Sequence, residues 1–325
     1  MNEHMNFKQK SLRYRGSVTV FIRECALLIL FISLFVLCSI FVDKFLTIDN
    51  IITILRQISF LAIVALGQFF VILTGSIDLS IGAIIGLMSI FFAGFIVDYN
   101  MTLGVALIVV FILAIIVGLT NGILTVIGKI PSFIATLVTM NVIRGIVFIY
   151  SQGLPISGLP AEFRMLGMGH FWIIPVPVVL MVILGAILHV FTKHTPLGRS
   201  FFAIGGNMEA SRLSGINVKF VAILAFVLSA VLAGIGAIGM TSRTMAGVAT
   251  MGEHMLFDII TVVVLGGTAL TGGRGKVINV ILAAMFIGVI NNAMVLLGID
   301  AYWQWIVKGI ILLTVVLVDS NTRKD

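Results

Sequence analysis

Residues 66–87 read LGQFFVILTGSIDLSIGAIIGL, and Asp78 is the only ionisable side chain among them. Apolar residues fill both sides of a short Thr-Gly-Ser segment at 74–76, and each side continues into a further apolar run. A helix of about 20 mainly apolar residues spans the hydrocarbon core of a bilayer. The stretch therefore predicts the end of one membrane helix, a short connection, and the start of a second membrane helix.

The rest of the chain has the same composition. Of its 325 residues, 60% are hydrophobic and 10% are charged, against about 25% charged residues in soluble domains. A soluble globule of this size could not hide so many apolar groups, because its surface needs polar cover. These values exclude a soluble enzyme, a nucleic-acid-binding protein and a secreted disulfide scaffold. The two cysteines, Cys25 and Cys38, lie in one apolar run and are predicted to be inert thiols.

We predict an all-α polytopic membrane protein with about ten transmembrane helices in a single domain over residues 1–325. The predicted spans are residues 25–42, 51–74, 79–97, 102–127, 132–151, 172–191, 220–240, 256–272, 277–298 and 301–318. The 256–272 segment is short and rich in glycine, so a re-entrant or broken helix is the alternative there.

The distribution of Lys and Arg orients this map, because both favour the cytoplasmic side of short loops. With both termini inside, the cytoplasmic segments hold 14 of the 20 Lys and Arg residues. The outside segments hold three, Lys44, Arg164 and Arg243. The opposite orientation would reverse this bias, so both termini are predicted to be cytoplasmic.

A faint repeat of the pattern Gly-x-x-Asn-x6-Gly occurs in the fourth and ninth spans. Its members are Gly118, Asn121 and Gly128 in one span, and Gly288, Asn291 and Gly298 in the other. These two spans run in opposite directions in the predicted topology, as an inverted repeat requires. We therefore expect a pseudo-symmetric core in which spans two to five mirror spans seven to ten.

Motifs for catalysis and metal binding are absent. The segment GGTALTGGRGKV at 266–277 is similar to a phosphate-binding loop, but Leu270 and Val277 stand where that pattern needs Gly and Ser or Thr. No His-Glu-x-x-His, Gly-x-Ser-x-Gly or Cys-x-x-Cys pattern occurs. We predict no catalytic residue, no metal ligand and no ATP hydrolysis by this chain.

Polar side chains within the predicted spans have two interpretations. Asp78 or Ser76 could cap the third helix, or Asp78 could serve a transport pathway. Gln68, Asn121, Asn141, Asn291 and Asn292 lie within apolar helices, where hydrogen bonds between helices are the ordinary explanation. Arg144 and Lys308 also fall within spans and need partners or an interfacial position, and the sequence does not assign their partners.

The cytoplasmic loop at 192–219 contains a short helix signature. Asn207 is a plausible N-cap, Glu209 complements the helix N-terminus, and Gly215 fits the position after the C-cap. The pattern predicts about two helical turns at 208–214. This element is either a stiff part of a solvated loop or a docking surface for a partner.

Five segments resemble the permease subunits of bacterial ABC sugar importers of the ribose type. They are ILTGSIDLSIGAIIGL (72–87), KIPSFIATLVTMNVIRGI (129–146), AIGGNMEASRLSGI (203–216), VVVLGGTALTGGRGK (262–276) and GVINNAMVLLGI (288–299). The resemblance implies ten membrane helices, two permease copies around one pore, and a periplasmic sugar-binding protein. It also implies a cytoplasmic ATPase with two nucleotide-binding halves in tandem. ATP would be bound there, with no cofactor on this chain.

The resemblance further implies that 192–219 is the coupling loop to this ATPase. The implied coupling residues are Asn207, Glu209, Ala210, Ser211, Arg212 and Gly215. Ser211 departs from the family, which usually has Ala there. The expected translocation path includes Gln68, Phe69, Asp78, Asn121, Asn141 and Asn291.

The function implied by the resemblance is import of a monosaccharide, a ribose-type pentose or a hexose, across the inner membrane. Permeases for autoinducer 2, nucleosides or branched-chain amino acids share this helical plan and remain alternatives. A more remote alternative is an ion-coupled secondary transporter. The acidic residues Glu24, Asp78, Asp258 and Asp319 argue against it, since all of them map near predicted helix ends.

Overall fold

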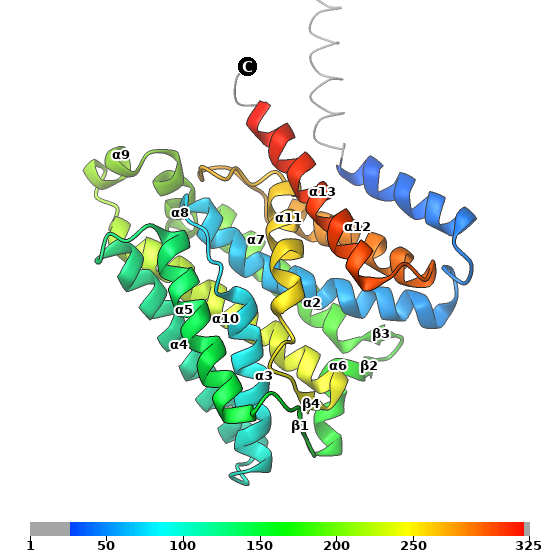
Figure 1. The fold of residues 1–325 in the computed structure, drawn as a ribbon. Helices are drawn as coiled ribbons and strands as arrows, with labels where there is room; N and C mark the ends of the chain where they lie inside the picture. The colour runs from blue at the N-terminus through cyan, green and yellow to red at the C-terminus, as the bar shows by residue number, and fades with distance from the viewer. Residues whose placement is uncertain (1–26, 322–325) are drawn as a thin grey trace, which may run out of the picture.

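The computed structural model describes residues 27–321, with side chains up to residue 317. The basic N-terminal tail, Glu24, Cys25, Arg323 and Lys324 lie outside the described residues. The chain is an all-α membrane protein in which long apolar helices make up most of the fold (Figure 1). Six of the described helices, α2, α4, α5, α7, α10 and α12, are long and apolar enough to cross a membrane.

Each of the ten predicted spans contains a helix. In order they are Leu27–Phe41, α2 (Ile48–Leu73), α3 (Ile81–Val97), α4 (Leu103–Val126), α5 (Ser132–Ser151), α7 (Val176–His194), α10 (Val218–Thr244), α11 (Leu256–Leu265), α12 (Val277–Leu296) and α13 (Ala301–Asn321).

Helices α2 and α10 form the centre of the fold. α10 packs along α4, α2 and α3, and α12 packs along α2 on another side. A Cβ atom on Gly67 of α2 would lie 2.9 Å from the Ser229 carbonyl oxygen of α10, and one on Gly118 of α4 would lie 2.7 Å from the Val227 Cα. Small residues let helix backbones approach closely where no hydrophobic effect drives them together. The glycines of α2 and α4 therefore set the spacing of this core.

Helix α3 begins in the interior of the fold, where Asp78, Ser80 and Ile81 are fully buried. The irregular segment 74–80 leads into it, and two hydroxyls of α5 accept hydrogen bonds from its backbone amides. The Ile77 amide donates to Ser132 Oγ at 3.1 Å, and the Leu79 amide donates to Thr136 Oγ1 at 3.0 Å. Non-helical backbone inside a membrane is tolerated where protein surrounds it in this way.

Helix α11 also begins in the interior of the fold, after the segment 245–255, which packs against α3. A Cβ on Gly247 would lie 2.7 Å from the Ser89 carbonyl oxygen, and a Cβ on Gly82 would lie 2.7 Å from the Gly252 carbonyl oxygen. The segment thus runs along α3 from the middle of that helix to its first turn. Helix α11 ends at Leu265, within the predicted span 256–272, and Gly267, Gly272 and Gly273, all with left-handed backbone, lie in the turn that follows it.

Two connections contain more structure than the sequence predicted. The 152–170 loop holds β1 (Ile156–Ser157), the 3₁₀ turn η1 (Ala161–Phe163), α6 (Arg164–Met168) and the start of β2 (His170–Phe171). β1 pairs antiparallel with β4 (Ala246–Gly247), and β2 pairs antiparallel with β3 (Ile174–Pro175). The β2–β3 turn delays the start of α7 to residue 176. A second 3₁₀ turn, η2 (Glu253–Met255), precedes α11.

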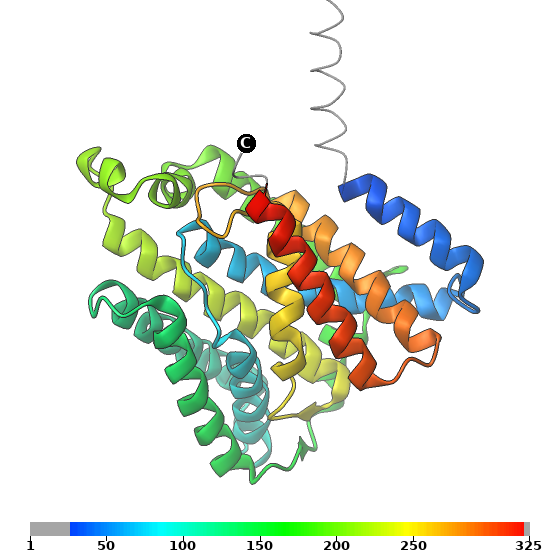
Figure 2. The same cartoon turned by 45° about the horizontal axis from the view of Figure 1, so that its top comes forward.

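The 192–219 loop contains two helices, and the sequence predicted only one. α8 (Pro196–Gly206) follows α7 directly, and α9 (Met208–Leu213) corresponds to the predicted helix. Both lie at the end of the molecule opposite α6 and the strands, as the two views show (Figures 1 and 2).

Candidate functional site

Helix α9 has the two ends that the sequence predicted. The Asn207 side-chain oxygen accepts a hydrogen bond from the Ala210 amide at 2.9 Å. At the other end Gly215 has a φ of 84°, its amide donates to the Arg212 carbonyl at 3.1 Å, and the Ile216 amide donates to the Ser211 carbonyl at 3.1 Å. This pair of bonds is a Schellman motif. A helix of six residues is therefore fixed at both ends.

The outer surface of α9 combines one ion pair with apolar side chains. Arg212 donates to Glu209 Oε1 at 2.6 Å, and both side chains are exposed. Leu213 is 78% exposed and Met208 is also exposed. Ser211 instead faces inward, and its hydroxyl donates to the Asn207 carbonyl. Exposed apolar residues beside charges are typical of a surface that binds another protein.

Helix α8 joins this surface to the core. Asn207 is both the C-cap residue of α8 and the N-cap residue of α9. A Cβ on Gly205 would overlap the Leu73 carbonyl oxygen at the end of α2 and the Gly273 amide after α11. The same Gly273 amide donates to the Leu73 carbonyl at 2.9 Å. α2, α8 and the 266–276 turn thus meet at one backbone junction.

Asp78 lies in a buried polar cluster at the start of α3. Its Oδ1 accepts from the Ser80 amide at 2.8 Å and from the Ser80 hydroxyl at 2.6 Å, and Asn121 of α4 donates to that hydroxyl at 2.8 Å. Ser80 is the N-cap position of α3, so the prediction that Asp78 or Ser76 occupies it is wrong. The Ser132 and Thr136 hydroxyls of α5 bond the backbone amides on either side of Asp78.

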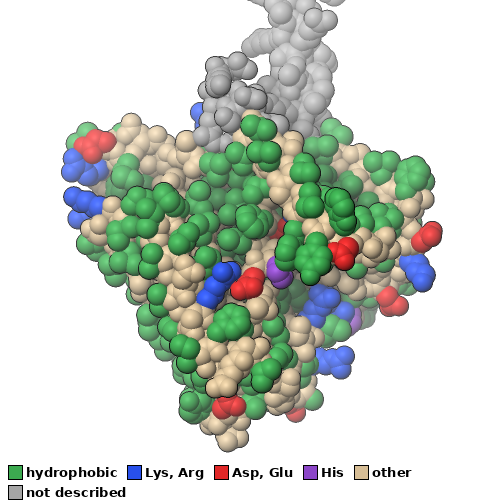
Figure 3. All heavy atoms as spheres, in the orientation of Figure 1, with side chains coloured by type: hydrophobic (Ala, Val, Ile, Leu, Met, Phe, Trp, Pro, Cys, Tyr) green, Lys and Arg blue, Asp and Glu red, His purple; other side chains and the backbone are tan. Residues whose placement is uncertain are grey.

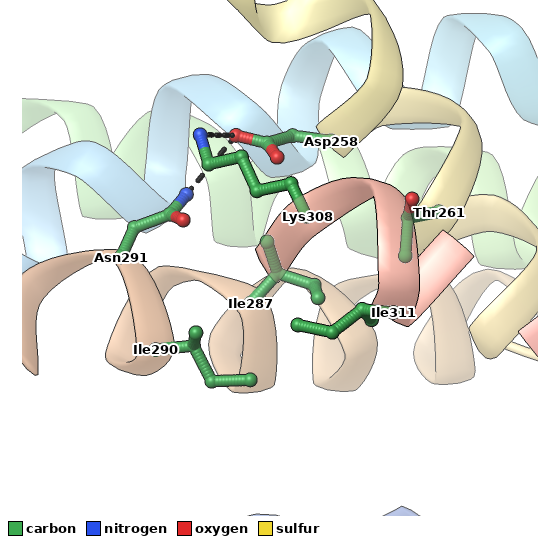
Figure 4. Close-up of a pocket in the computed structure, with 7 residues that line it drawn as sticks. All are labelled: Asp258, Thr261, Ile287, Ile290, Asn291, Lys308 and Ile311. Carbon is green, nitrogen blue, oxygen red and sulfur yellow. Dashed lines mark hydrogen bonds and ion pairs between the residues drawn. The ribbon is translucent and has the colours of Figure 1, made fainter. Parts of the chain in front are cut away.

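A second cluster joins α11, α12 and α13 (Figure 4). Asp258 Oδ2 accepts from Lys308 Nζ at 2.7 Å and from Asn291 Nδ2 at 3.0 Å, and the three side chains point toward one another. Ile287, Ile290 and Ile311 surround them. Asp258 and Lys308 are therefore a buried ion pair held among apolar groups.

These two clusters bear on the argument that acidic residues near helix ends speak against an ion-coupled transporter. Asp78 and Asp258 do lie near helix ends, but α3 and α11 begin inside the fold and both carboxylates are buried. Proximity to a helix end therefore does not put these acids at a membrane surface.

The remaining path candidates differ in exposure. Gln68 and Phe69 are fully enclosed in α2, and Phe69 packs edge-on against Phe70 and Phe202. Asn141 is exposed on α5, where its amide donates to the Leu137 carbonyl. The structure does not bring Asn141 together with the enclosed candidates.

Sequence reasoning missed Arg56, a charged residue inside α2. Its guanidinium donates to the Met168 carbonyl at 2.7 Å and lies 3.0 Å from His170 Nε2. An open pocket of about 550 Å³ lies beside it, lined also by Arg164. An arginine inside an apolar span is itself a signal of a functional or structural role, and this signal could have singled out Arg56 from the sequence.

Comparison with known proteins agrees with this architecture. A family profile described as branched-chain amino acid transport system / permease component matches residues 50–316. The ribose import permease protein of Bacillus subtilis is 42% identical over 90% of this chain and 92% of its own length. The ribose import permease protein of Haemophilus influenzae is 38% identical over 94% and 96%, respectively.

A further relative is the autoinducer 2 import system permease protein of Photorhabdus laumondii, 32% identical over 93% of this chain and 90% of its own length. The search of solved structures found no match. The profile covers more than three quarters of the chain, and its matched region runs from α2 into α13. The chain belongs to the family of branched-chain amino acid transport system / permease components.

Proposed function

We propose that this chain is the membrane-spanning permease subunit of an ABC importer. Its cargo is a monosaccharide, a ribose-type pentose or a hexose, carried across the bacterial inner membrane. The similarity to ribose import permeases over nine-tenths of the chain carries the proposal. Helix α9 adds support, because a permease that hydrolyses no ATP needs a surface through which an ATPase can act on it.

The proposed assembly has two permease copies around one pore, a periplasmic sugar-binding protein, and a cytoplasmic ATPase with two nucleotide-binding halves in tandem. ATP is bound on the ATPase, and this chain holds no cofactor. Residues 1–325 form one permease domain with about ten membrane helices, an inverted pseudo-symmetric core and both termini in the cytoplasm. The separation of α9 from α6 and the strands supports this topology (Figure 2).

In this proposal, 192–219 is the coupling loop. ATP binding closes the two halves of the ATPase. The membrane helices of the permease then move as rigid bodies in response to this closure. Asn207 and Gly215 keep α9 stiff, and the exposed Glu209, Arg212 and Leu213 form the contact surface. The small residues Ala210 and Ser211 keep α9 narrow between these contacts. The junction at Gly205 passes the movement of α9 to α2 and to the turn after α11.

Of the six path candidates, Asn141 is the one that is exposed, and we retain it as a substrate contact. The other five are buried or half-buried. We assign Gln68, Phe69, Asp78, Asn121 and Asn291 the role of holding the helices that border the path. Weak binding along the path suits transport, because a tight site would slow release.

Uptake of labelled ribose in a bacterial strain without its own ribose permease tests the proposal. The chain, expressed with its candidate ATPase and binding protein, should restore uptake. Glu209→Lys and Leu213→Asp should insert normally, lose copurification of the ATPase and lower uptake at least about tenfold, since both change the centre of a protein interface. Arg199→Ala, exposed on α8, is the matched control.

Uptake that needs no ATPase, or that stops when ion gradients collapse while ATP remains, would instead support the ion-coupled alternative. Among importers, the similarity to autoinducer 2 permeases favours autoinducer 2 as the second candidate cargo. Competition of labelled ribose uptake by unlabelled ribose, a hexose, autoinducer 2, a nucleoside or leucine separates the sugar proposal from all the importer alternatives.

A further inference from the structure

Helix α5 carries a charged side chain inside its membrane span. Arg144 lies twelve residues after Ser132 and seven before Ser151, the two ends of α5. At 1.5 Å per residue it is about 18 Å from one end and about 11 Å from the other. Its side chain is 38% exposed on the outside of the chain, one turn from the exposed Asn141. Arg144 is thus neither at a helix end nor enclosed by this copy of the protein.

The partner of Arg144 lies beside the first turn of α3, far from Val97. Arg144 Nε is 3.4 Å from Glu253 Oε1, and the Glu253 side chain is 27% exposed. Glu253 follows Gly252, whose carbonyl contacts Gly82 in the first turn of α3. Gly82 is fifteen residues from Val97, the outer end of α3, or about 22 Å along the helix axis. The ion pair therefore does not belong to the outer membrane surface.

Aromatic rings continue this surface toward α13. The ring of His254 stacks on Trp305 with 5.0 Å between centroids and 26° between planes, and Tyr302 meets Trp305 edge-on at 5.5 Å. His254, Trp305 and Tyr302 are all exposed. We name Asn141, Arg144, Glu253, His254 and Trp305 the α5–α13 patch. Figure 3 shows basic, acidic and histidine side chains gathered in the middle of a largely hydrophobic face.

Lipid cannot cover this patch at low cost. A charged residue at the centre of a membrane helix costs about 2.5–3.5 kcal/mol on insertion scales, and such residues face a bundle interior or a water-filled cavity. The patch holds two charged side chains, an amide and an imidazole, and all of them are partly exposed. It must therefore face water or a second protein surface in the membrane.

We propose that the α5–α13 patch is the sugar-contacting wall of the translocation path, an inference that rests on the function proposed above. A monosaccharide has a face of C–H groups, which stacks on an aromatic ring, and an edge of hydroxyls, which bond charged groups and amides. Trp305 with His254 supplies the flat aromatic surface. Arg144, Glu253 and Asn141 supply the donors and acceptors. A second copy of the chain presents the same residues across the path.

Transport by the complete complex in proteoliposomes tests the sugar contact. Trp305→Leu should lower the sugar transported per ATP hydrolysed about fivefold, because it removes an aromatic stacking partner. Trp305→Phe keeps a ring and should recover most of the ratio. Trp303→Leu, at the other exposed tryptophan nearby, should leave the ratio at the wild-type value. A wild-type ratio in Trp305→Leu overturns the proposal, as does an equal loss in Trp303→Leu.

Cysteine labelling tests the water-filled surface independently of transport. In a full-length chain with Cys25→Ser and Cys38→Ala, cysteines at positions 141 and 305 should react with a charged thiol reagent, and saturating ribose should slow both reactions. A cysteine at exposed Ile187 of α7 is the lipid-facing control and should not react. Absence of labelling at 141 and 305 overturns the proposal even if the wild type imports ribose.

A wild type that imports no sugar while 141 and 305 label normally refutes the proposed function and the sugar contact together. Labelling without protection by ribose, in a chain that does import ribose, refutes only the sugar contact.

Discussion

The Lys308 ammonium and the Asp258 carboxylate are held 2.7 Å apart between three helices, with side chains that are 17% and 7% exposed. Asn291 adds a third helix to the contact. A buried charge that loses its partner costs far more than a pair replaced by neutral groups. At the scale of single residues, this ion pair joins α13 to α11.

Removing one charge of this pair should be worse than removing both. Lys308→Met should lower the free energy of unfolding in detergent by about 3 kcal/mol, because Asp258 then lacks its counter-charge. The double variant Lys308→Met with Asp258→Asn should recover most of that loss. Thermal unfolding of both variants beside the wild type measures the difference, and a double variant no more stable than the single one would contradict this account.

Local residue roles followed from the sequence, and distant pairings did not. Asn207 and Gly215 were predicted correctly because a helix cap depends on neighbours within a few residues. Lys308 and Arg144 were recognised as charges within spans, but their partners are 50 and 109 residues away. No local pattern encodes such a pairing, because it depends on how α5, α11 and α13 pack.

Among the elements, α8 is the longest helix that sequence reasoning missed. Its start carries ordinary signals, since Thr195 Oγ1 accepts from the Gly198 amide at 2.9 Å and Pro196 occupies the first helical position. Gly205 and Gly206 at its end resembled loop residues. The structure explains Gly205 by the backbone junction with Leu73 and Gly273, which leaves no room for a Cβ.

The adjacent glycines Gly205 and Gly206 provide a matched pair of substitutions. Gly205→Ala would overlap the backbone of α2 and that of the turn after α11, and overpacking of this kind costs about 1–3 kcal/mol. It should lower the unfolding temperature and the ATPase stimulation by the binding protein. Gly206→Ala has no atom within 4 Å of the new Cβ and should match the wild type in both measurements. Equal behaviour of the two variants would rule out the junction as the route between α9 and the core.

At the scale of the whole molecule, the packing supports an inverted repeat. In the predicted repeat, α2 (the second span) corresponds to α10 (the seventh), and α4 (the fourth) corresponds to α12 (the ninth). The packing of α4 along α10 therefore has its counterpart in the packing of α12 along α2. The two asparagines of the Gly-x-x-Asn match have equivalent roles. Asn121 bonds Ser80 at the start of α3, and Asn291 bonds Asp258 at the start of α11. The sequence predicted this correspondence from three matched positions but not the interior starts of α3 and α11.

Reporter fusions test the proposed topology. Green fluorescent protein joined after residue 129, after residue 206 or at the C-terminus should fluoresce, because these sites are cytoplasmic in the proposal. Alkaline phosphatase should be active only when inserted in the outer connections 98–102 or 152–160. Phosphatase activity at residue 206 would reverse the orientation and place α9 on the wrong side for an ATPase.

The backbone junction of α2, α8 and the turn after α11 has a kinetic consequence. The Leu73 end of α2 belongs to the first half of the proposed repeat and Gly273 to the second, and both contact Gly205. A displacement of α9 therefore reaches the two halves at the same moment, with no flexible side chain to absorb it. Single-molecule fluorescence of labelled transporters should accordingly show one concerted conformational change per transport cycle. No intermediate in which only one half of the protein has moved should be seen.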